Sequence, residues 1–181
     1  METTTSWVYV WLGVWRRPAP TSWTGHSALS LDSGLYISYW PSKSESFNFL
    51  SRKANILQWR PHRFTGSIDV DIRKLGQPDH AVAIKNLNER SMEHFWLNLK
   101  NGEQRRFHSL GHNCSTVVAR ALGRGHRDAI KELTFATPIN QIRWLEPSNY
   151  FAVVCAGIST GTLWYPSQVL RYARALAKVM N

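Results

Sequence analysis

Cysteine is scarce in this chain. The 181 residues include two, Cys114 and Cys155, so a disulfide framework is excluded, although one disulfide remains open. Long apolar runs are also missing, since no stretch reaches the ~18 residues of a membrane span. The apolar segment 6–15 is short, and two arginines follow it, whereas the basic residues of a signal peptide come first. These absences favour a free-thiol protein that is cytoplasmic or delivered by a dedicated secretion system.

Metal-binding and nucleotide-binding motifs are absent as well. The seven histidines show no His-Glu-x-x-His spacing, so a zinc enzyme is not expected. No glycine-rich phosphate loop and no zinc-finger spacing occurs, and we expect no metal and no cofactor. No internal repeat, low-complexity segment or linker divides the chain. Its length and composition therefore favour a single globular domain over residues 1–181.

Acidic residues are outnumbered by basic ones. The chain has 22 Lys and Arg against 12 Asp and Glu, for a net charge of +10, which attracts anionic partners. The nine tryptophans would suit base stacking or a membrane interface. Because no nucleic-acid-binding signature accompanies the charge, nucleic acid is not a favoured partner. Contact with an anionic membrane stays open, and the oligomeric state is not indicated.

Alternating apolar residues predict a β-hairpin close to the N-terminus. Residues 7–15 are expected to form a buried strand, and strands over 25–31 and 35–40 would be joined by the turn Asp32-Ser33-Gly34. The same alternation predicts a further strand over 67–72. Between these strands, the polar and basic segment 41–66 predicts a long surface loop of the kind that forms a lid or a substrate rim.

Helical spacing follows in the second half of the chain. We expect helices over 79–87, 88–99, 114–122 and 166–179. The second of these has an apolar face of the kind that packs against a protein core, formed by Met92, Phe95, Trp96 and Leu99. Gly123 fits the position just after the third helix. Cys155 lies in an apolar run, where an inert core thiol is expected.

Cys114 stands where an apolar helix begins. Asn113 is a good N-cap residue, and a thiol at a helix N-terminus feels the positive end of the macrodipole, which favours the reactive thiolate. The alternative is a buried cysteine in an ordinary core helix.

His26 and Ser38 are candidates for the partners of such a thiol. A cysteine nucleophile needs an imidazole to take its proton, and the imidazole needs a third polar group to orient it. If the hairpin turn is centred on residue 32, Ser38 lies opposite His26 and projects to the same face. The pattern therefore predicts that Ser38 contacts the far ring nitrogen of His26, with an ordinary strand serine as the alternative.

Taken in order, these residues resemble the circularly permuted papain-like enzymes, which include relatives of the NlpC-type peptidoglycan hydrolases and of lecithin-retinol acyltransferase. The resemblance is carried by the runs Gly-His-Ser-Ala-Leu-Ser-Leu (25–31), Tyr-Ile-Ser-Tyr-Trp-Pro (36–41) and Asn-Cys-Ser-Thr-Val-Val-Ala-Arg-Ala-Leu (113–122). It is greatest to a bacterial branch, some members of which are thought to be effectors or toxins. It implies a permuted papain-like α+β fold, in which a curved antiparallel sheet packs on the helix that carries the nucleophile.

The same resemblance implies roles for individual residues. Cys114 would be the nucleophile and His26 the general base and later the acid. Ser38 falls where acyltransferase-type relatives carry a second histidine, so it would orient the imidazole less strongly, unless another residue fills that role.

Residues next to the thiol would form the oxyanion hole and the substrate contacts. Backbone N–H groups at the start of the helix, around Asn113 and Ser115, could hold the oxyanion. His112, two residues before the nucleophile, could contact substrate, although a plain loop histidine is the alternative.

The chemistry implied is acyl transfer through a thioester acyl-enzyme. The first hypothesis is a cysteine hydrolase, a peptidase or amidase, acting on an amide bond of a peptide, of peptidoglycan or of a protein side chain. The second is a lipid acyl hydrolase or acyltransferase at anionic membranes. The third is a non-enzymatic basic binding domain.

Overall fold

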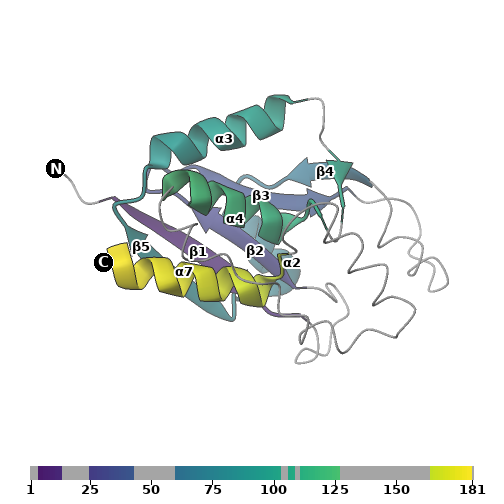
Figure 1. Ribbon diagram of the computed structural model, residues 1–181. Coiled ribbons are helices and arrows are strands. Elements are labelled where there is room, and N and C mark those ends of the chain that lie inside the picture. Colours follow the sequence, from purple (N-terminus) through teal and green to yellow (C-terminus); the bar gives the residue numbers. More distant parts are fainter. Residues whose placement is uncertain are drawn as a thin grey trace.

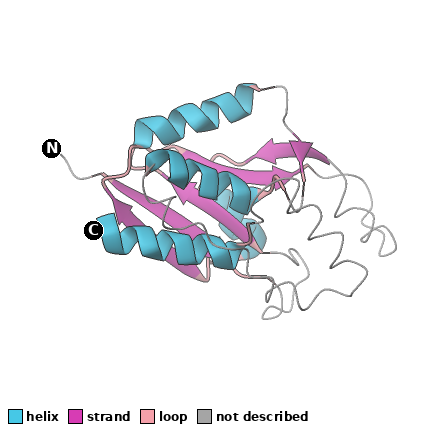
Figure 2. Ribbon diagram, viewed as in Figure 1, coloured by secondary structure: helices cyan, strands magenta, loops and turns pink. Residues whose placement is uncertain are grey.

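The computed structural model describes residues 4–13, 25–42, 60–102, 106–108, 111–126 and 164–180. In these ranges the chain is an α+β protein in which an antiparallel sheet is flanked by helices (Figure 2). The strands are β1 (Thr5–Trp11), β2 (His26–Ser30), β3 (Tyr36–Pro41), β4 (Arg60–Phe64), β5 (His80–Lys85) and β6 (Arg106–Phe107). The helices are α2 (Ile68–Leu75), α3 (Glu89–Asn101), α4 (Cys114–Gly125) and α7 (Pro166–Met180).

The sheet has the strand order β5-β1-β2-β3-β4-β6. Helices α3, α4 and α7 cover one of its faces, and α2 packs on the other (Figure 1). Successive side chains of a strand point to opposite faces. Each central strand therefore contributes alternate residues to two separate apolar clusters, one under α3, α4 and α7 and one under α2.

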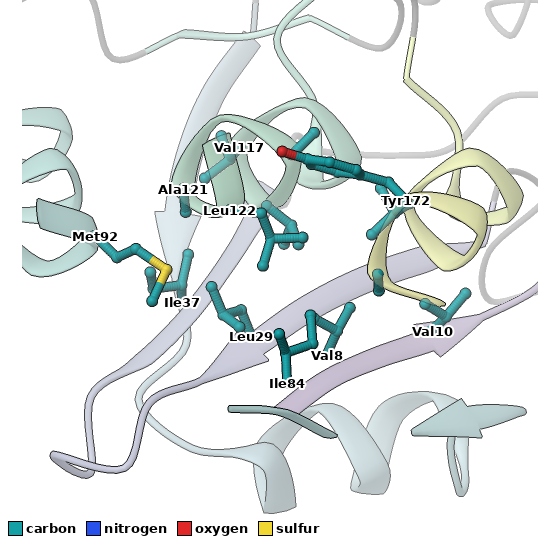
Figure 3. Close-up of a cluster of buried hydrophobic side chains, with 14 of the residues drawn as sticks. Val8, Val10, Leu29, Ile37, Ile84, Met92, Val117, Ala121, Leu122 and Tyr172 are labelled. Atoms are coloured by element: carbon teal, nitrogen blue, oxygen red, sulfur yellow. The ribbon is translucent and has the colours of Figure 1, made fainter. Parts of the chain in front are cut away.

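The larger cluster forms the main core. Figure 3 shows Leu29 and Ile37 of the sheet pointing toward Val117 and Leu122 of α4. The smaller cluster joins Trp11, Ala28 and Tyr36 of the sheet to the apolar stripe of α2, which consists of Ile68, Ile72 and Leu75.

The predicted N-terminal hairpin is present with a shifted register. Ala28, not His26, pairs with Ser38, so the turn is centred on residue 33 instead of 32. The shift amounts to two residues along β2. Because side chains alternate with a period of two, His26 and Ser38 still project to the same face of the sheet.

Two of the expected elements have the wrong type. In segment 67–72, expected as a strand, Ser67 is the N-cap residue of helix α2 and the other residues belong to the helix. Helix α2 packs Ile68, Ile72 and Leu75 at helical spacing. Residues 79–87, expected as a helix, contain strand β5 instead, paired with β1 along its whole length. An isolated helix of that length is only marginally stable in water, whereas strand β5 is held by its pairing with β1.

Two boundaries also differ from expectation. Segment 41–66 is not wholly a loop, because β4 pairs with β3 inside it, and residues 43–59 lie outside the described residues. Helix α4 continues past Gly123 to Gly125. A Cβ at Gly125 would come to 2.9 Å from Sδ of Met92, so a larger residue there would require the flexible side chain of Met92 on α3 to move.

Helices α3, α4 and α7 occur where the sequence predicted helices. Met92 and Trp96 are fully buried, and Phe95 and Leu99 pack against the core. Cys155 lies outside the described residues. Among the helices that the structure describes, none combines the length and apolarity required to cross a bilayer.

Two leucines permit a matched test of the core. Leu29 is fully buried in the main cluster, whereas Leu97 on α3 is 49% exposed. We expect Leu29→Ala to lower the free energy of unfolding by about 2–5 kcal/mol because it leaves a cavity. The same change at Leu97 should cost less than about 1 kcal/mol. Urea denaturation measures both, and equal losses would contradict this core assignment.

Candidate active site

The sheet opens between β2 and β3 at the point where the candidate residues meet. The ladder between these strands runs from the Ser30–Tyr36 pair to the Ala28–Ser38 pair and ends there. Strand β2 nevertheless extends to His26, where it pairs only with β1. The next residues of β3, from Tyr39 to Pro41, pair with β4. Helix α4, which packs on β2 and β3, begins at this opening with Cys114. A thiol carried on one face of the sheet thus meets an imidazole that projects to the other.

His26 is held by its neighbours on both sides. Gly25 has a positive φ of 73°, and a Cβ there would collide with the carbonyl oxygen of Trp11. Only glycine therefore fits before His26. The imidazole stacks on Trp40 with ring centroids 4.2 Å apart, and Trp11 lies 5.5 Å away on a tilted plane. His26 is 1% exposed, so its orientation is fixed by packing.

Asp71 is the residue that the sequence did not predict. Its side chain is fully buried, and its two carboxylate oxygens accept five hydrogen bonds. Oδ2 accepts from Nε2 of His26 (3.2 Å), the hydroxyl of Tyr36 (2.8 Å) and the hydroxyl of Ser38 (2.6 Å). Oδ1 accepts from Nε1 of Trp40 (2.9 Å) and the hydroxyl of Thr65 (3.1 Å). The orienting group of the imidazole is therefore a carboxylate carried by α2.

Ser38 links the imidazole to this carboxylate. Because the Ser38 hydroxyl donates to Asp71, its oxygen accepts from Nε2 of His26 at 3.0 Å and from Nε1 of Trp40 at 3.1 Å. Nε2 of His26 therefore carries the hydrogen, since both of its partners need a donor. This arrangement fixes the tautomer and leaves Nδ1 for the hydrogen bond between His26 and Cys114. The predicted contact between Ser38 and His26 is confirmed.

The pKa values of the three groups favour an ion pair. Burial alone would lower the pKa of His26, but the charge of Cys114 and the hydrogen bond to Asp71 outweigh it and raise that pKa to about 9. Burial likewise opposes ionisation of Cys114, yet the charge and hydrogen bond of His26 lower the thiol pKa. Burial would raise the pKa of Asp71, but the interactions with His26, Ser38 and Tyr36 hold it at about 2.

Two serines complete the surroundings of the thiol. Ser115 is 1% exposed, and its Oγ lies 4.0 Å from Sγ of Cys114 and 3.2 Å from Oγ of Ser27. The backbone N–H of Ser27 and the hydroxyl of Ser115 both lower the pKa of Cys114. Donors aimed at the sulfur stabilise the thiolate beyond what the imidazole supplies. Ser115 therefore acts directly on the thiol of Cys114.

Asn113 caps helix α4, as its sequence position predicted. Its side-chain oxygen accepts from the backbone N–H of Thr116 at 2.8 Å, and its amide donates to the carbonyl of Trp164 at 3.1 Å. The first N–H groups of a helix have no partner inside it. The N–H groups of Cys114 and Ser115 stand in that position, where an oxyanion on the substrate would need donors.

His112 is held by contacts on the core side of the sheet. Its Nδ1 donates to the carbonyl of Arg106 at 2.9 Å, and its backbone exchanges hydrogen bonds with His108. Burial, followed by the charge of Arg120, lowers the pKa of His112, which keeps the ring neutral near pH 7. The ring packs at a tilt on Tyr39. Its position is that of a structural histidine on the core side of the sheet.

The structure thus brings together Cys114, His26, Ser38 and Ser115, all proposed from the sequence, and adds Asp71. One signal could have found Asp71. Segment 68–75 has acidic residues in its first turn and Arg73 and Lys74 in its last, a charge pattern that favours a helix. Among the described residues, no group of three or more His, Cys, Asp and Glu side chains is arranged to hold a metal ion.

Comparisons with protein-family models, with curated proteins and with solved structures found no match to this chain.

Replacement of Asp71 tests its control over the imidazole. In Asp71→Asn the negative charge and an acceptor are lost, so the pKa of His26 should fall below about 9, as followed by NMR titration of its ring protons. Asp69→Asn is the matched control, because Asp69 lies on the same helix but is exposed. An unchanged titration of His26 in Asp71→Asn would contradict the assignment.

Ser115→Ala tests the donors around the sulfur. Without the hydroxyl, the pKa of Cys114 should rise by up to about one pH unit, measured as the pH dependence of alkylation by iodoacetamide. Ser30→Ala removes a hydroxyl from the partly exposed end of β2 and should leave this profile unchanged. Equal profiles for wild type and Ser115→Ala would show that the hydroxyl does not act on the thiol.

Proposed function

We propose that this chain is a cysteine-dependent hydrolase that cleaves an amide bond through a thioester acyl-enzyme. The observation that carries the proposal is the buried chain of groups Cys114, His26 and Asp71, in which the thiol pKa is lowered and the imidazole pKa is raised. Purely structural cysteines in apolar surroundings have raised pKa values. A lowered pKa in a thiol with a paired imidazole is typical of a nucleophile.

The geometry supports the following sequence of steps. Nδ1 of His26 takes the proton of Cys114, and the thiolate attacks the substrate carbonyl, forming a carbon–sulfur bond. N–H groups at the start of α4 stabilise the oxyanion. When the intermediate collapses, the carbon–nitrogen bond breaks and Nδ1 returns the proton to the leaving amine. Water then attacks the thioester, giving its proton to Nδ1, and the thiol is released with the carboxylic acid.

The same proposal includes a permuted papain-like fold for this chain. A permuted papain-like architecture requires a strand histidine, a polar partner on the next strand and a cysteine that opens a helix packed on the sheet. This chain has His26 on β2, Ser38 on β3 and Cys114 at the start of α4. The α+β class and the antiparallel sheet are compatible with that architecture. The carboxylate supplied by α2 compensates for a serine in the place where acyltransferase-type relatives carry histidine.

The experiment that tests the proposal uses a Cys155→Ser background, so that Cys114 is the one remaining thiol. Wild-type protein and the variants Cys114→Ser and His26→Ala are mixed with a p-nitrophenyl ester, and the acyl-enzyme is detected by intact mass. We expect a stoichiometric burst in wild type, none in Cys114→Ser, and acylation at least about a hundredfold slower in His26→Ala. An unmodified Cys114 in the wild-type protein would overturn the proposal and favour a non-enzymatic binding domain.

Assays with two kinds of substrate distinguish an amide hydrolase from a lipid acyl hydrolase that uses the same residues. Peptide p-nitroanilides report amide cleavage, and vesicles of anionic phospholipid report release of fatty acid. Cleavage of the anilides supports the proposal. Fatty-acid release alone would instead assign the residues to lipid ester hydrolysis, the reading that the net charge of +10 supports.

The pH dependence follows from the two shifted groups. The thiolate is present above the lowered pKa of Cys114, and the imidazolium that protonates the leaving group is lost as pH rises through about 9. We therefore expect a bell-shaped profile of kcat/KM, measured with the most reactive anilide, with its alkaline limb near pH 9. An alkaline limb near pH 6.5, the ordinary histidine value, would contradict the raised pKa of His26.

A further inference from the structure

Trp40 separates the catalytic imidazole from two cationic side chains. His26 stacks on the indole at 4.2 Å. Nζ of Lys74 lies 5.1 Å from the centroid of the same ring, and Cζ of Arg63 lies 5.9 Å from it. The imidazole and both cationic side chains therefore contact the same indole. Two positive charges are thus gathered next to the candidate site.

One donor of the Arg63 guanidinium has no acceptor among the described residues. Its Nε is buried and has no hydrogen-bond partner, and no ion pair of Arg63 occurs among the residues that the structure describes. The contact with Trp40 offers a π-face but no acceptor. An arginine has five N–H donors and stays charged. A buried donor without a partner is costly, and such a group in a native structure often marks a bound water or ion.

The buried carboxylate of Asp71 does not supply the missing acceptor. Its Oδ1 accepts from the indole N–H of Trp40. A carboxylate offers about four lone-pair sites, and the oxygens of Asp71 already accept five hydrogen bonds. Asp71 is therefore not the acceptor for Arg63.

We propose that Arg63 and Lys74 form a binding subsite for an oxyanionic group, a carboxylate or a phosphate, on the ligand of this protein. The planar guanidinium fork matches such a group in a bidentate manner, and Lys74 adds charge from α2. Since Trp40 lies between them, Arg63 and the ring of His26 are within about 10 Å, which is close to one Debye length at 0.1 M salt. For the hydrolase proposed above, on which this assignment of substrate class rests, the substrate carries a negative charge near the scissile bond.

The test reads anion binding directly and does not require catalysis. The indole N–H of Trp40, assigned by its absence in Trp40→Phe, and the Nε–H of Arg63 are followed by ¹H–¹⁵N NMR. Inorganic phosphate and acetate are titrated separately against chloride at equal ionic strength. We expect saturable shifts of both signals with phosphate or acetate but not with chloride. A stronger response to one of them identifies the class of oxyanion.

Variants locate the binding. Arg63→Gln should weaken the affinity for the oxyanion by at least about tenfold, and Arg63→Lys, which keeps the charge but loses the fork, should weaken it less. Arg73→Gln is the matched control, because Arg73 is exposed on the same helix as Lys74, and it should bind as wild type does. Linear shifts without saturation, or equal losses in Arg63→Gln and Arg73→Gln, would overturn the subsite.

The outcome is independent of the hydrolase proposal. Saturable anion binding with no acyl-enzyme at Cys114 would support the oxyanion subsite and contradict the hydrolase proposal. Acylation of Cys114 without anion binding would support the hydrolase and contradict the proposal that its substrate is negatively charged.

Discussion

Five hydrogen bonds converge on the carboxylate of Asp71, and the arrangement of the candidate site depends on them. An ionised carboxylate in a protein interior is stable only if its oxygens are well bonded. Here the donors come from β2, β3 and the segment after β4, so one side chain of α2 holds three parts of the sheet in a fixed relation. The same bonds fix the tautomer of His26, and through it the state of Cys114.

The candidate site joins the two faces of the sheet. Helix α4 lies on the face with the main core, while Asp71 and α2 lie on the other. They meet because the β2–β3 ladder ends at Ala28 and Ser38, which leaves room for Cys114 beside His26. Had the ladder continued, the backbone of the two strands would separate the thiol from the imidazole. The site therefore depends on the point at which β2 and β3 stop pairing as well as on its side chains.

Local signals in the sequence were sufficient for one half of the site. The cap at Asn113 and the apolar stripe after it located Cys114, and the alternation around a turn placed His26 and Ser38 on one face. Apolar spacing alone could not locate Asp71 because segment 67–72 fits two periods at once, and among the local signals only the charge pattern of the segment favours the helix. Ile68 and Ile72 are spaced for a strand and also for a helix, and the choice is made by packing on Trp11 and Tyr36. Such a choice depends on residues distant in sequence.

Helix α2 is eight residues long and rests on the smaller of the two clusters. Short elements on a small apolar contact open at a lower free energy than the main core does. Partial unfolding of α2 would withdraw the carboxylate while α4, α7 and the sheet beneath them stay folded. The carboxylate that orients the imidazole is therefore carried by a short helix outside the main core, so the integrity of the candidate site and global stability are separable.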